Sequence, residues 1–463
     1  MSIIIFITII ILLFLLGLGI SVILNVDDIL ELWSLSWLLG MGFGTLFWFI
    51  SYQLLHLSFT LTSLFTILII SNILVFSYAI STKNKVIFKL LNVNIWKKII
   101  PSVSQNLRKN HALLYSVCII LFIFGFIFLQ DIFWPVTDWD ALALYDFRAK
   151  VIISTGTLEQ GKELGYFFQY PPFTTLLHTI TYLSGLQVAK IWYAIIYQAT
   201  IINFFVLLKK ESSTTVSILG TLFLAVSPQI YAHAFMAYTN LSYTIYTGLG
   251  FIYLWLWFNS SQRNYSILGG ILIGLGTWVR ISEPFYYIGL ILVILTFVKS
   301  LLQLKTDRKF LFLDTIVTSS FVLFIRYPWD RLIFTLFSTN VNTPLATISL
   351  VNNWNIQLII SRFFEVSSYL ITYSLPTYSL YLFIACLLLL NDLYNKRWGV
   401  VIKYLTILLL LGTIFVGTLI TSLWLESWNR IGDSVARMSM VLIPLVIYTI
   451  FTSPSWKYYR KSK

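Results

Sequence analysis

The sequence predicts an all-α polytopic membrane protein, and its composition and hydropathy pattern both indicate this. The 463 residues are 58% hydrophobic and only 11% charged, and the mean hydropathy is +0.84. Such a chain has too little charge to cover the surface of a soluble domain. Apolar stretches of about 18 or more residues recur from end to end, long enough to cross roughly 30 Å of hydrocarbon. Because lipid offers the backbone no hydrogen-bond partners, and the alternating pattern of a membrane barrel is absent, these stretches are predicted to be helices.

The charge distribution predicts the orientation in the membrane. A net charge of +13 could suggest a nucleic-acid partner, but Lys and Arg concentrate in short loops that alternate with neutral or acidic loops. This is the positive-inside pattern of membrane proteins. It argues against nucleic acid and places the basic segments 82–112 and 453–463 in the cytoplasm. Residues 131–186, where acidic residues outnumber basic ones, are predicted to lie outside the plasma membrane.

The alternation of loops gives about 13 transmembrane helices. Residues 1–81 form a three-helix extension, whose first helix lacks a basic start and a small-residue cleavage site and is expected to be uncleaved. Residues 113–452 form the main membrane domain. The predicted helices cover residues 3–24, 32–50, 57–80, 113–130, 188–208, 214–228, 241–258, 265–278, 285–297, 311–329, 369–390, 405–423 and 438–451. The apolar segment 173–185, which follows two prolines, must not cross if every basic cluster is to stay inside, so it is predicted to be interfacial or re-entrant.

Ionisable residues collect in the outer loops, and the predicted midplane is nearly empty of them. Asp138 and Asp140, two residues apart, could act as a general base and as an orienting partner or metal ligand. A solvated acidic loop is the alternative reading of this short motif. Trp134 and Trp139 flank the motif, and indole rings suit both the membrane interface and stacking on sugars.

Arginines at the outer ends of two predicted helices are candidates for binding a phosphate. A guanidinium is well shaped for that anion, so Arg280 and Arg437 are assigned this role. Glu283 follows Arg280 closely, and a mutually neutralising pair at the interface is the alternative. His178 and His233 lack metal-ligand spacing and are expected to be packed or interfacial, and no P-loop, nucleophile elbow or zinc motif occurs.

The order of several short segments resembles the first outer loop of GT-C glycosyltransferases. These segments are Trp139-Asp140-Ala141, Tyr145, Ala149-Lys150, Thr155-Gly156 and Tyr170-Pro171-Pro172. The stretch 274–283 resembles a middle helix end in the protein O-mannosyltransferase-like and aminoarabinose-transferase-like branch, and Arg437 with Pro444 resembles its last helix. The resemblance covers residues 112–452. This chain differs in its three additional N-terminal helices and in having its two acids spaced rather than adjacent.

The resemblance implies a GT-C-type helical bundle with outer-face loops and interfacial helices. It also implies an inverting sugar transfer from a polyprenyl-phosphate-linked donor to a lipid, glycan or protein acceptor. Asp140 would be the base, with Asp138 beside it and Mg²⁺ or Mn²⁺ between them if a divalent cation takes part. Substrate-binding residues would be Arg280, Glu283, Arg437, Lys150, Tyr170 and Trp139. A transporter or lipid-sugar flippase, or a surface-polysaccharide polymerase or ligase, is the alternative.

Overall fold

The computed structural model describes residues 1–82, 86, 111–161, 168, 170–280, 284–303, 308–337, 355–374, 379–425 and 428–454. Every regular element in this part of the chain is a helix. Eight described helical segments are long and apolar enough to cross a membrane: Ser2–Ile23, Ile29–Leu55, Leu61–Ser81, Leu113–Phe133, Ile191–Glu211, Phe285–Leu302, Leu311–Phe337 and Val401–Trp424. The chain is therefore a multi-pass helical membrane protein, as the composition predicts. Shorter apolar helices cover Thr214–Ala225, Ser379–Tyr394 and Val435–Phe451, where the sequence predicts further spans.

The helices form two compact units. Unit 1 is residues 1–168, 172–226 and 231–238, and unit 2 is residues 169–171, 227–230 and 239–463. The helices of unit 1 are α1 (Ser2–Ile23), α2 (Ile29–Leu55), α3 (Leu61–Ser81), α6 (His111–Phe133), η1 (Ala141–Asp146), α7 (Phe147–Thr155), α8 (Phe173–Leu183), α9 (Ile191–Glu211) and α10 (Thr214–Ala225). The short helix α11 (Pro228–His233) lies where the chain passes from one unit to the other.

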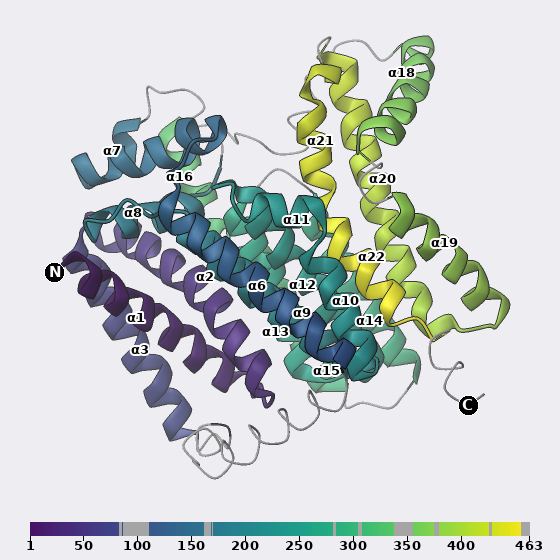
Figure 1. Ribbon diagram of the computed structural model, residues 1–463, viewed down its shortest axis with the longest axis horizontal. Helices are drawn as coiled ribbons and strands as arrows, with labels where there is room; N and C mark the ends of the chain where they lie inside the picture. The colour runs from purple at the N-terminus through teal and green to yellow at the C-terminus, as the bar shows by residue number, and fades with distance from the viewer. Residues whose placement is uncertain are drawn as a thin grey trace. The chain divides into compact units, whose positions relative to one another are not determined.

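Glycine brings the first two helices of unit 1 into backbone contact. α1 packs against α2 and α3, and the three lie side by side in Figure 1. A Cβ added at Gly17 would overlap the carbonyl oxygen of Ser36, and one added at Gly40 would overlap the carbonyl oxygen of Leu13. Small residues allow this approach, which supplies packing where lipid offers no hydrophobic driving force. Asn72 on α3 adds a hydrogen bond from its Nδ2 to the Leu12 carbonyl oxygen at 3.0 Å.

Polar contacts fix which helix ends of unit 1 lie together. At one end, Lys210 in the last turn of α9 donates to Glu31 in the first turn of α2 at 2.8 Å. At the opposite end of α2, the Phe59 amide donates to the Gly156 carbonyl at 2.9 Å. The Leu158 amide donates to the Tyr52 hydroxyl at 3.2 Å. The α2–α3 corner therefore lies beside the segment that follows α7.

The predicted non-spanning segment is a short helix. α8 covers Phe173–Leu183, and its 11 residues give a length of about 16 Å at roughly 1.5 Å per residue, about half the hydrocarbon thickness. Residues 173–181 are all buried. Trp192 on α9 donates from Nε1 to Thr181 Oγ1 at 2.8 Å and so ties α8 to a spanning helix. The length of α8 agrees with the prediction that this segment does not cross.

Unit 2 is built around α12 (Thr239–Ser260), whose residues 239–257 are all buried. It packs against α13 (Arg263–Val279), α14 (Phe285–Gln303) and α22 (Leu442–Phe451). Trp255 on α12 donates to Thr406 Oγ1 on α20 (Val401–Trp424) at 3.0 Å. The remaining helices of unit 2 are α15 (Arg308–Phe324), α16 (Tyr327–Phe337), α18 (Ile356–Tyr369), η4 (Leu370–Ser374), α19 (Ser379–Tyr394) and α21 (Gly432–Met438).

The region after α16 differs in part from the sequence prediction. The helix predicted over 369–390 overlaps η4 and α19, and residues 375–378 between them lie outside the described residues. The interval between the helices predicted over 311–329 and 369–390 is partly helical, because α16 extends to Phe337 and α18 begins at Ile356. The basic segments 82–112 and 453–463 lie almost entirely outside the described residues.

The glycine contact between α1 and α2 predicts an asymmetric effect of alanine. Gly40→Ala forces a Cβ against a backbone oxygen that cannot rotate away, and overpacking of this kind costs about 1–3 kcal/mol. Gly125→Ala on α6 is the matched control, because nothing lies within 4 Å of a Cβ added there. We expect thermal unfolding in detergent to show a lower midpoint for the first variant only. Equal midpoints would contradict the close approach.

The contacts at the two ends of α2 predict that its two connections lie on opposite sides of the membrane. Asp27 and His56 are both exposed, at the α1–α2 and α2–α3 connections. In a background with Cys118 and Cys386 replaced by serine, single cysteines at positions 27 and 56 should react differently with a membrane-impermeant maleimide in intact cells. We expect one of the two to be labelled and the other protected. Labelling of both from outside would mean that α2 does not cross.

Candidate active site

The predicted catalytic carboxylates lie at the start of a continuous helix in the first large loop. The Leu142 amide donates to the Asp138 carbonyl oxygen at 2.9 Å, so the helical turn begins here. The chain continues through η1, a π-helical segment, into α7 without a break. The Asp138 and Asp140 side chains are both half-buried, whereas Trp139 is 78% exposed. π-helical turns are rare and often mark functional sites, so this position is compatible with a site.

The arrangement at Asp138 and Asp140 does not form a protein metal site by itself. Residues two apart at a helix start do not share a face. Within the described residues, no three His, Cys, Asp or Glu side chains gather closely enough to hold a metal ion. Two carboxylates are fewer than the six oxygen ligands of Mg²⁺, so a divalent cation here would need water and substrate oxygens as well. We derive no step through a metal.

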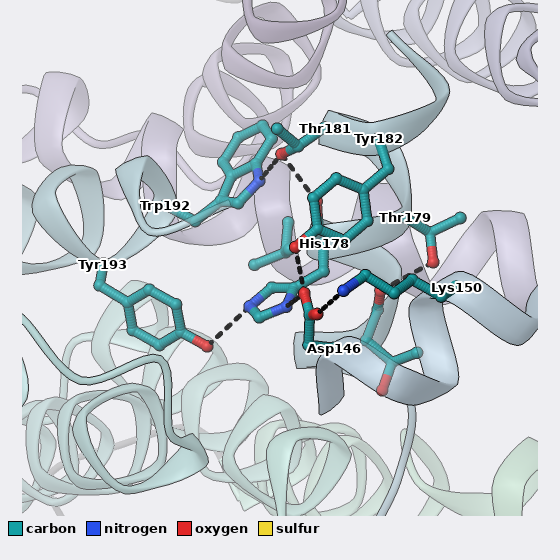
Figure 2. A network of polar contacts seen from close by, with 10 residues as sticks. Asp146, Lys150, His178, Thr179, Thr181, Tyr182, Trp192 and Tyr193 are labelled. Carbon is teal, nitrogen blue, oxygen red and sulfur yellow. Dashed lines mark hydrogen bonds and ion pairs between the residues drawn. The ribbon is translucent and has the colours of Figure 1, made fainter. Parts of the chain in front are cut away.

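A buried polar network lies at the other end of η1, around Asp146 (Figure 2). The Asp146 carboxylate accepts from Lys150 Nζ at 2.7 Å and from the Tyr182 hydroxyl of α8. His178 Nδ1 lies 3.6 Å from the same carboxylate. On its other side, His178 Nε2 shares a hydrogen bond of 3.3 Å with the Tyr193 hydroxyl of α9. The network therefore links the loop helix to α8 and, through α8, to a spanning helix.

The partners of Asp146 determine its ionisation. Burial of the carboxyl raises its pKa, but His178, Lys150 and Tyr182 outweigh burial and lower the pKa of Asp146 to about 2. Burial and the neighbouring carboxylate raise the pKa of Tyr182, which stays protonated and donates. Asp146 is therefore a fixed anion at neutral pH and a poor proton acceptor. Lys150, assigned to substrate binding from the sequence, is 59% exposed in its side chain and holds this anion.

Two sequence-predicted substrate-binding residues meet in unit 2. The Arg280 guanidinium lies over the Tyr170 ring, 5.3 Å from its centroid, although the residues are far apart in the chain. Arg280 follows the last residue of α13 and donates from Nη1 to Asn240 Oδ1 at the start of α12. A ring face and an amide thus hold the guanidinium at a helix end. Such contacts fix the orientation of a planar cation without neutralising its charge.

The other predicted substrate-binding residues of unit 2 are Arg437 and Glu283. Arg437 lies in the last turn of α21 and is half-buried. Glu283 lies outside the described residues, so its predicted pairing with Arg280 stays a prediction. His178 is fully buried and hydrogen-bonded, which confirms that it is a packed histidine.

Sequence reasoning missed Asp146 and Tyr182 as partners, and it gave no role to Asn240. The Asp146–Lys150 spacing of four residues was a usable signal, because residues four apart face each other on a helix. No pattern in the sequence connects Asp146 to Tyr182 or Arg280 to Asn240. The sequence also gave no role to Arg148, which is 2% exposed and whose pKa burial lowers to about 10, leaving it cationic at neutral pH.

None of the protein-family models, curated proteins or solved structures compared with this chain matches it.

Proposed function

We propose that this chain is a membrane glycosyltransferase of the GT-C type. It would have about 13 transmembrane helices and move a sugar, with inversion, from a polyprenyl-phosphate-linked donor to a lipid, glycan or protein acceptor. The reaction would occur at the outer face of the plasma membrane. Nucleotide sugars are cytoplasmic, whereas a lipid-linked donor can be presented laterally from the bilayer to a site on that face.

The observation that carries the proposal is the arrangement of Arg280 with Tyr170 and Asn240. The lipid phosphate that departs from the anomeric carbon must be stabilised by positive charge. An arginine at the end of a buried helix, oriented by an aromatic ring and an amide, is suited to bind a phosphate with two parallel hydrogen bonds. Arg280 and Tyr170 are both among the substrate-binding residues that the resemblance implies.

The remaining assignments follow the chemistry of the transfer. Asp140 would remove the acceptor proton, and Asp138 would orient the acceptor or contact a divalent cation. Arg437 and Glu283 would assist donor binding, and Trp139 is exposed enough to stack on a sugar. Lys150 pairs with Asp146, and its side chain is exposed enough that the ammonium could also contact the substrate.

The contacts of unit 1 also support an orientation for the N-terminus. The positive-inside rule places Lys209 and Lys210 in the cytoplasm. Together with the Glu31–Lys210 contact, this favours a cytoplasmic α1–α2 connection and residue 1 on the outside. The same threading returns α3 to the cytoplasm, where the basic segment 82–112 is predicted, so the two arguments agree.

Asp140→Asn should nearly abolish transfer, because it removes the proton acceptor while preserving size. Loss of general-base catalysis costs about 10²- to 10⁴-fold in rate. Asp138→Asn should cost less. The measurement is sugar transfer in proteoliposomes with a polyprenyl-phosphate-sugar donor, after folding of each variant has been verified by thermal unfolding. Normal turnover in both variants would overturn the mechanism and favour transport. Loss confined to Asp138→Asn would reassign the base.

Arg280→Lys should weaken the donor interaction while keeping the charge, because an ammonium cannot form the two parallel bonds. We expect KM for the donor to rise about tenfold, which corresponds to a loss of about 1.4 kcal/mol. Arg263→Lys is the matched control, since Arg263 begins the same helix and pairs with Asp314 at 2.9 Å. A KM that is unchanged in Arg280→Lys, or raised equally in both variants, would remove the phosphate assignment.

A further inference from the structure

The helix that carries Asp140 is anchored at two places C-terminal to it. The first anchor is Asp146, 3% exposed, which accepts from the Tyr182 hydroxyl and lies beside His178. Both partners belong to α8, which is joined to α9 by the Trp192–Thr181 and His178–Tyr193 hydrogen bonds. A continuous chain of contacts therefore runs from a spanning helix to the last residue of η1. Figure 2 shows these contacts converging on Asp146.

The second anchor is at the end of α7. Gly156 adopts a left-handed conformation with φ of +72°, and its carbonyl accepts from Phe59 in the α2–α3 corner. Two residues later, the Leu158 amide donates to Tyr52. This anchor does not involve Asp146, so loss of Asp146 leaves it in place. The part of the helix N-terminal to these anchors includes Asp138 and Asp140, and there η1 packs against α8 with Ala141 and Tyr145 buried.

We propose that Asp146 is a positioning residue that fixes η1 on α8 and thereby orients Asp140 for catalysis. The catalytic part of this inference, that Asp146 orients Asp140, rests on the proposed function. The geometric part, that Asp146 orders the start of this helix, stands without it. A displacement of about 1 Å at a catalytic group can cost about 100-fold in rate, so an anchor six residues away is sufficient to control turnover.

Asp146 is suited to hold the helix and unsuited to act as the base. Its carboxylate already faces Lys150, Tyr182 and His178, and almost none of it is exposed. Its lowered pKa keeps it ionised and reduces its basicity. Asp140 lies at the N-terminal end of the same helix and is half-buried.

Spin labels on the same helix test the ordering directly. Leu142 in η1 and Ile153 in α7 are each 37% exposed, so they form a matched pair of label sites. Labels would be placed singly at these positions in a background with Cys118 and Cys386 replaced by serine. We expect Asp146→Asn to increase the mobility of the label at 142 and to leave the label at 153 unchanged. Equal loosening at both sites, or no change at 142, would overturn the inference.

Kinetics then separate positioning from a general loss of structure. We expect Asp146→Asn to lower kcat about 10- to 100-fold with little change in donor KM, as for other supporting residues around a reactive group. Tyr182→Phe, which removes one bond to the same carboxylate, should give a smaller loss. In the Asp140→Asn background, Asp146→Asn should have no further effect, because coupled residues are not additive.

The two proposals fail in different ways. If Asp140→Asn keeps normal turnover, Asp140 is not the base, and the label at 142 still decides whether Asp146 orders the helix. If Asp140→Asn loses turnover while Asp146→Asn keeps it, the positioning role is wrong and the proposed mechanism stands. Multiplicative losses in the double variant would also overturn it, because they would show that Asp146 acts independently of Asp140.

Discussion

A backbone inside hydrocarbon can form hydrogen bonds only with itself or with other parts of the protein, and this constraint governs the structure. It requires helices wherever the chain crosses, and the described elements are all helical. It also places charged side chains where they can reach partners. The buried Asp131 is two residues before the end of α6 and pairs with Lys190, which immediately precedes α9.

The same constraint explains how the helices associate. Lipid tails are as apolar as the side chains that face them, so helices gain from close contact and from interhelical hydrogen bonds. α1 and α2 use the first route at Gly17 and Gly40. α2 and α9 use the second, where Asn203 donates to Ser34 Oγ at 3.0 Å. α12 and α13 approach through Gly250 and Gly269. These contacts give the loops a rigid support.

The loop helix depends on that support in a specific way. An acidic segment next to a membrane span would be a solvated loop if nothing held it. Here Asp146 is buried with three polar partners, and the cost of burying a carboxylate is offset by the groups that face it. In the proposed mechanism, Asp146 holds the helix and does not react itself. The half-buried acids at the start of the helix can then take part in the transfer.

The sequence by itself determined the class of protein and most of its helices. An uninterrupted apolar run can cross lipid only as a helix, so most spanning helices up to α14 lie close to their predicted ranges. The sequence did not predict α18 before residue 369, because a helix of 14 residues is too short to give a spanning-length apolar run. It identified Tyr170 and Arg280 separately, but only the tertiary structure brought them together with Asn240. The Asp146 network was likewise decided by tertiary packing, because hydrogen bonds between α8, α9 and the loop helix produce no periodic pattern in the sequence.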